Sequence, residues 1–132
     1  MSSSKNPQTN PEVSRYREKC NNILAVSPSI RYAGIMNKFG RTIAGGLRKG
    51  VTPLLKPEEA RNEYFIEATR NQLRKNFEKS IGKTEYTFTE NEKVKILTLS
   101  TDEYFYYITI DKDASQAEVV KVVESVRKLS KQ

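Results

Sequence analysis

The arrangement of apolar and polar residues predicts a helix and then a β-hairpin in the first third of the chain. Apolar residues recur every three or four positions over residues 11–25, as they do on one face of an amphipathic helix. Residues 30–37 have strand character, and the tight turn that follows closes at Gly40. We expect a return strand over residues 41–45, and then a basic connector over residues 47–56 that glycine and proline interrupt.

A long amphipathic helix is predicted for residues 57–81, which begin with a proline and two glutamates and are followed by Gly82 as a helix stop. Glutamates come early in this segment and Lys and Arg come late, which suits the helix dipole. Phe65, Ile66 and Thr69 lie off the main apolar stripe. They indicate either a second contact surface or a wide core face with a loop over its edge. The main stripe, expected to face the core, is Ala60, Tyr64, Ala68, Leu73, Phe77 and Ile81.

The second half of the chain predicts three strands and a final helix. Residues 83–90, 93–101 and 104–111 are strand-like and are joined by short polar turns, which favours an antiparallel meander. A capping box then opens the last helix, with Ser115 accepting from an amide and Glu118 reaching back. The element order is helix, two strands, long helix, three strands, helix. It predicts an α+β fold, with a single five-stranded antiparallel sheet flanked by three helices.

The surplus positive charge of the protein lies in one stretch, residues 19–57. This stretch holds seven Lys and Arg residues, no Asp or Glu, and five of the six glycines, and it accounts for the formal net charge of +7. Fixed positive charge beside bare main-chain N–H groups suits an anionic partner. The candidate anion- or partner-binding residues are Arg31, Lys38, Arg41, Arg48, Lys49 and Lys56.

Three interpretations of these basic residues stay open. They can form a solvated, solubilising loop. They can dock an acidic protein surface, with an affinity that falls as salt screens the contact. They can also meet the phosphates of a nucleic acid or another anionic ligand, with a steep salt dependence from counterion release.

The composition excludes several classes of enzyme and of metal site. The chain has no histidine, and Cys20 is its one cysteine, so intramolecular disulfides, Cys/His zinc sites and His-based catalysis are excluded. We expect Cys20 to be buried. Residues 40–46 begin with the spacing of a phosphate loop but lack its Gly-Lys-Ser/Thr ending. The acid pairs Asp102–Glu103 and Asp111–Asp113 are interpreted as turn residues. We therefore predict no catalytic residue, no metal, no cofactor and no enzyme activity.

The length and the polar start of the chain suggest its organisation. Residues 1–11 are rich in Ser, Asn and Pro, which predicts a disordered tail and not a signal peptide. Residues 12–132 are predicted to be one domain. No run of 18 apolar residues occurs, so we expect no membrane span and a cytoplasmic protein.

The element order, with a hairpin of residues 30–40 and 41–45 that ends in Ala and Gly, resembles the roadblock/LC7 family within the profilin-like and longin-like group. It is also similar to small uncharacterised archaeal proteins. The resemblance implies the sheet order 2-1-5-4-3, with the first and last helices on one face and the long helix on the other. With helices on both faces, the aromatic run of residues 104–107 is interpreted as core packing and not as a base-stacking surface.

The resemblance also implies a role. Roadblock domains commonly form homodimers through the long helix and the third strand, and they act as non-catalytic scaffolds or regulators of small GTPases and motors. By position, residues 58–81 and 83–90 would form the dimer face here. One departure is that residues 38–40, Lys-Phe-Gly, replace an acidic residue that is usual in the first hairpin turn. The implied dimer-interface residues are Tyr64, Phe65, Thr69, Tyr86 and Phe88.

The function expected from the sequence is therefore a dimeric, non-enzymatic scaffold or regulatory module whose basic edge docks an acidic partner, such as a small GTPase. The second strand would be a sheet edge, which places Arg41, Arg48 and Lys49 along a rim. The alternative is a nucleic-acid or anionic-ligand binder that uses the same connector. A third hypothesis is a small-molecule sensor that binds its ligand between sheet and helix.

Overall fold

The computed structural model describes residues 11–132. The disordered tail expected for residues 1–11 lies outside this range except for Pro11, which is the first residue of a helix. In chain order the elements are α1 (Pro11–Leu24), β1 (Ile30–Asn37), β2 (Thr42–Leu47), α2 (Pro57–Arg74), the 3-10 turn η3 (Lys75–Phe77), α3 (Glu78–Ile81), β3 (Thr87–Glu90), β4 (Val94–Ser100), β5 (Tyr104–Asp111) and α4 (Gln116–Ser130).

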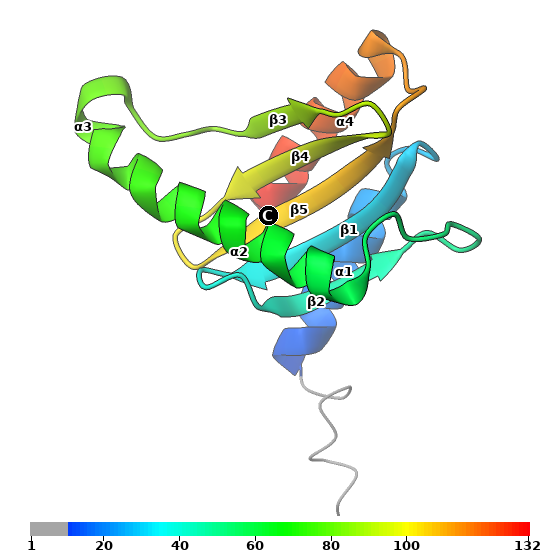
Figure 1. The fold of residues 1–132 in the computed structure, drawn as a ribbon, viewed down its shortest axis with the longest axis horizontal. Coiled ribbons are helices and arrows are strands. Elements are labelled where there is room, and N and C mark those ends of the chain that lie inside the picture. Colours follow the sequence, from blue (N-terminus) through cyan, green and yellow to red (C-terminus); the bar gives the residue numbers. More distant parts are fainter. Residues whose placement is uncertain (1–10) are drawn as a thin grey trace, which may run out of the picture.

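The strands form one antiparallel sheet in the order β2-β1-β5-β4-β3, with β5 at its centre. Helices α1 and α4 cover one face, and α2 crosses the other (Figure 1). The predicted α+β fold, strand order and placement of the helices are confirmed. In the described part of the chain, no helix is both long enough and apolar enough to cross a membrane.

The side chains of β5 alternate between the two faces of the sheet and make both halves of the core. Tyr106, Ile108 and Ile110 pack with α1 and α4, and Cys20 is buried on this side as expected. Phe105 and Tyr107 pack in the smaller apolar cluster beneath α2. Phe105, Tyr106 and Tyr107 are each about 1% exposed, and Tyr104 is partly buried against the α1/α4 core, so the aromatic run packs into the core as interpreted.

The long helix differs from the prediction in its second half. It ends at Arg74 and continues only as η3 and the single turn α3. Leu73, Phe77 and Ile81 were expected in the core, but they are 58%, 50% and 70% exposed. Figure 1 shows that the end of α2 and α3 extend past the sheet.

The two sheet edges also differ from the prediction. The third strand begins at Thr87 and not at residue 83. The second strand runs through Gly45 and Gly46 to Leu47, although these glycines were expected to end it. Glycine is required at position 45 of this strand because the Tyr32 ring lies over it. A Cβ at this position would collide with the Tyr32 hydroxyl.

The start of α4 forms half of the predicted capping box. Ser115 Oγ accepts a hydrogen bond from the Glu118 amide at 3.1 Å. The second half of the prediction is wrong, because the Glu118 carboxylate does not reach back but accepts from the Ser27 hydroxyl. This contact joins the first turn of α4 to the loop that follows α1.

Candidate interaction surfaces

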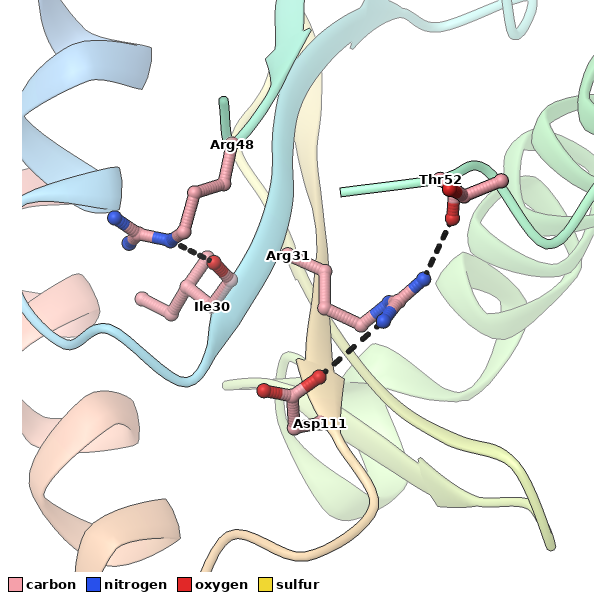
Figure 2. Close-up of polar contacts among 5 residues, drawn as sticks. All are labelled: Ile30, Arg31, Arg48, Thr52 and Asp111. Carbon is pink, nitrogen blue, oxygen red and sulfur yellow. Dashed lines mark hydrogen bonds and ion pairs between the residues drawn. The ribbon is translucent and has the colours of Figure 1, made fainter. Parts of the chain in front are cut away.

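Arg48 has a structural role that the sequence did not reveal. It lies directly after β2, and its guanidinium points toward the segment between α1 and β1 (Figure 2). Nε donates to the Ile30 carbonyl at 2.7 Å, and Nη2 donates to the Ser27 carbonyl at 2.7 Å and to the Leu24 carbonyl. Leu24 is the last residue of α1, and the last carbonyls of a helix have no partner within the helix. Arg48 therefore supplies a donor to one of these terminal carbonyls of α1 from outside the helix.

Arg31 is also engaged within the chain. Its Nη1 lies 3.3 Å from Asp111 Oδ1, and its Nη2 donates to the Thr52 carbonyl at 2.8 Å (Figure 2). These contacts join the start of β1 to the end of β5 and to the connector between β2 and α2. Asp111, which was considered as part of an acid pair, is therefore one half of an ion pair.

The other four candidate basic residues are exposed but do not form one cluster. Lys38 and Arg41 lie in the turn that precedes β2, whereas Lys49 and Lys56 lie in the connector after it. The six residues of β2 separate the two groups by about 20 Å. Within residues 11–132, none of the four side chains has a hydrogen bond or ion pair, and the Lys38 ammonium lies over the Phe39 ring. A role of these residues in binding stays a prediction.

A cavity of about 530 Å³ lies beneath the first half of α2. The sheet supplies one wall, and the connector and α2 supply the others. Tyr32, Leu54, Leu55 and Tyr64 make the lining largely apolar. Leu54 and Leu55 are about half exposed at its edge.

The underside of α2 is held on the sheet partly by buried polar contacts. Tyr107 donates its hydroxyl to Glu63 Oε1 at 2.8 Å, and Thr98 lies 3.5 Å from Glu67 Oε1. Burial raises the pKa of Tyr107, as does the contact with Glu63. Burial also raises the pKa of Glu67, although Arg70 opposes that shift. From the sequence, the early glutamates of this helix were explained by the helix dipole alone. Two of them, Glu63 and Glu67, instead face the sheet and bond to it.

The opposite side of α2 is an exposed apolar face. Phe65 and Ile66 are 63% and 56% exposed, and Leu73 lies on the same side about two turns later. Phe77 and Ile81 continue the apolar surface into η3 and α3. The outer face of α2, as we call these five residues, occupies roughly 25 Å along the helix. Of the two alternatives from the sequence, a wide core face with a loop over its edge does not apply within residues 11–132, because these side chains are exposed there; a second contact surface stays a prediction.

The residues implied for a dimer interface lie in three places. Tyr64 faces the sheet, where its ring meets Tyr107 edge-on at a centroid distance of 5.0 Å. Phe65 and Thr69 are on the exposed side of α2. Tyr86 lies beneath the Arg127 guanidinium of α4, and Phe88 packs against the α1/α4 core. The exposed surface also includes four residues that were not among the implied interface residues: Ile66, Leu73, Phe77 and Ile81. Of these, only Ile66 could have been found from the sequence, because it lies off the main apolar stripe.

No cluster of the described residues has the composition of a metal site. The glycine-containing segment 40–46 forms the turn and most of the second strand of the predicted hairpin. Gly40 has a φ of +88°, and Asn37 Oδ1 accepts from the amides of Phe39 and Arg41 at 2.9 and 3.0 Å.

Burial raises the pKa of the Cys20 thiol to about 11, which disfavours its reactive thiolate form.

Comparison with solved structures shows which proteins share this fold. An MglB "with tetrameric arrangement" has a TM-score of 0.69 at 13% identity, over 92% of both chains. A roadblock/LC7 domain from Streptomyces avermitilis has a TM-score of 0.58 at 13% identity, over 88% of this chain and 98% of that one. Profilin II from Acanthamoeba castellanii has a TM-score of 0.58 at 10% identity, over 86% and 94%. The expected roadblock/LC7-like and profilin-like fold is confirmed, and at these identities the similarity concerns the fold alone.

Comparisons by sequence give a family without an assigned activity. No curated protein matches the chain. A family model described as "Family of unknown function (DUF6659)" matches residues 8–131, which is most of the sequence. The chain therefore belongs to the DUF6659 family, and its fold is that of roadblock/LC7 domains.

Proposed function

We propose that this protein is a non-enzymatic regulatory module that binds other proteins and acts as a homodimer. The observation that carries the proposal is the outer face of α2, where five large apolar side chains are each at least half exposed. Contiguous apolar surface of this kind marks protein interaction sites. The shared fold adds support, since one MglB with this fold has a tetrameric arrangement.

The charges along α2 favour a second copy of the chain as the partner of this face. Glu58 and Glu59 lie in the first turn, Arg74 lies in the last turn, and Arg70 lies just before it. Two α2 helices that pack antiparallel about a two-fold axis near Ile66 bring the acidic first turn of each close to the basic last turn of the other. A two-fold interface must be self-complementary, and this distribution of charge meets the requirement.

We further propose that the basic edge around β2 docks an acidic partner, for which a small GTPase is a candidate. After Arg31 and Arg48 are assigned to internal contacts, the exposed cations of this edge are Lys38, Arg41, Lys49 and Lys56. Lys49 and Lys56 both lie in the connector after β2. Leu54 and Leu55 lie between the last two and add apolar surface. A patch with both features suits an acidic protein surface better than it suits a uniformly charged phosphate backbone.

The dimer is tested by measuring self-association of the Phe65→Ala variant in sedimentation equilibrium. Burial of a whole Phe side chain contributes about 1.5–3 kcal/mol, and Phe65 has 63% of its surface left to bury. Two copies then contribute about 2–4 kcal/mol, which corresponds to a roughly 25- to 700-fold weaker dimer. Alanine favours helix, so the variant should fold.

Val120→Ala is the matched control, because Val120 is 51% exposed on a different helix, α4. It should leave the dimer constant unchanged. If Phe65→Ala and Val120→Ala have the same effect, α2 does not form the interface and the proposed dimer is wrong.

The cavity beneath α2 supports a second candidate function, the binding of an apolar small molecule. Its volume of about 530 Å³ and its aromatic lining are typical of ligand sites. Ala60 lines it, so Ala60→Trp should fill it and abolish binding of the fluorescent probe anilinonaphthalene sulfonate, whereas Val120→Trp should not. Absence of probe binding to the unaltered protein would contradict this function.

A further inference from the structure

The outer edge of β2 is open for main-chain pairing. β2 pairs with β1 on one side and is the last strand of the sheet on the other. The Arg48 amide donates to the Arg31 carbonyl, so alternation along an antiparallel strand directs the main-chain groups of Gly45 and Leu47 away from β1. In the described residues, no hydrogen bond joins these outward groups to another segment.

This edge has few of the features that usually prevent strands from adding to a sheet. Natural edge strands are interrupted by charged residues or proline, but Thr42–Leu47 contains neither. A β-bulge does occur near Thr42, where the register with β1 shifts. It leaves residues 44–47 in regular register as an unprotected segment.

Gly46 is a strand glycine that the packing of the described residues does not explain. No atom lies within 4 Å of the position a Cβ would occupy at Gly46, and its φ is outside the left-handed region. The fold itself therefore does not require glycine there, unlike at Gly45, where Tyr32 leaves no space. Glycine inside a strand weakens the strand and commonly marks a close approach of a ligand or another backbone.

The exposed cations nearest to this segment lie just beyond its two ends. Arg41 immediately precedes β2, and Lys49 follows it by two residues. Both side chains lack a partner within residues 11–132. An extended chain beside β2 can meet both of them with carboxylates that are about six to eight residues apart.

We propose that β2 binds an extended, acidic segment of a partner protein as a sixth strand of the sheet, with Arg41 and Lys49 holding carboxylates near its ends. This inference rests on the proposed role in protein binding and specifies how the acidic partner docks. Main-chain pairing gives affinity in such strand addition, and side chains at the ends give direction and selectivity.

The test uses a capped, fluorescein-labelled peptide of about ten residues that alternates Glu and Val, a length that covers β2 and both cations. Fluorescence polarisation should show saturable binding that weakens as salt is added. Arg41→Glu and Lys49→Glu should each weaken binding by about fivefold. Lys121→Glu, an exposed charge reversal on α4, is the matched control and should change nothing.

A second peptide separates strand addition from simple charge attraction. N-methylation of every other amide keeps all the side chains but removes the donors that would pair with β2, so binding should fall by at least about tenfold. Equal binding of both peptides would overturn strand addition, and so would an equal effect of Lys121→Glu. If neither peptide binds, the docking mode is wrong, while the dimer is judged separately by the Phe65→Ala measurement.

Discussion

Replacement of Arg48 by alanine should destabilise the protein much more than replacement of its neighbour Lys49. The guanidinium makes three hydrogen bonds to the main-chain carbonyls of the segment that leads from α1 to β1. Alanine removes all three at once and leaves a carbonyl of the last turn of α1 without this donor. Lys49 is exposed, and its side chain makes no hydrogen bond or ion pair in the described residues.

The expected loss follows from the number and kind of these bonds. Hydrogen bonds that involve a charged group contribute about 1.5–3 kcal/mol each. Bonds that share one donor group are not additive, and water can replace part of them at this partly buried site. We therefore expect a total loss of about 2–4 kcal/mol, which is a large part of the roughly 5–15 kcal/mol that stabilises a typical domain.

Urea denaturation followed by circular dichroism measures this loss. With an m value of about 1–3 kcal/mol/M, the Arg48→Ala midpoint should fall by about 0.7–4 M. Lys49→Ala should stay within about 0.5 kcal/mol of the parent. Equal midpoints for the two variants would refute the structural role of Arg48. Charge reversal at Arg48 is therefore not a clean test of partner binding, because it would also destabilise the protein.

Two further predictions concern α2 and β2. Burial raises the pKa of Glu67 above 4.5, so the folded protein binds this proton more tightly than the unfolded chain, and the stability that this provides is lost as pH rises. Glu67→Gln should therefore be more stable than the parent near neutral pH and equally stable below about pH 4, as measured by urea titrations at several pH values. A difference in unfolding free energy that does not change with pH would contradict the pKa shift. Gly45→Ala should cost about 1–3 kcal/mol because its Cβ collides with Tyr32, whereas Gly46→Ala should be nearly neutral; similar costs at both positions would contradict the packing.

The sequence predicted the fold well because its signals were local and repeated. The alternating apolar residues of β5 and the helical spacing in α1 and α4 each defined an element without reference to the rest of the chain. The extent of α2 packing was not predictable in this way. Leu73, Phe77 and Ile81 continue the helical stripe, but whether a stripe is buried depends on where the sheet ends.

The candidate site was less predictable because it depends on contacts between distant residues. Arg48 and Lys49 are adjacent basic residues and look equivalent in the sequence, yet only Arg48 reaches the carbonyls at the end of α1. The basic stretch likewise appeared continuous in the sequence. In the structure, β2 lies within it and separates its exposed basic residues into two groups, and the positions of charged residues in the sequence do not reveal this separation.

Burial of the outer face of α2 in a homodimer is tested most directly by light scattering of the unaltered protein at micromolar concentrations. The expected mass is twice the 15.1 kDa of one chain. Phe65→Asp combined with Leu73→Asp would place four charges in the interface and should return the mass to that of one chain, whereas Val120→Asp should remain a dimer. A mass of 15.1 kDa for the unaltered protein across this concentration range would contradict the homodimer.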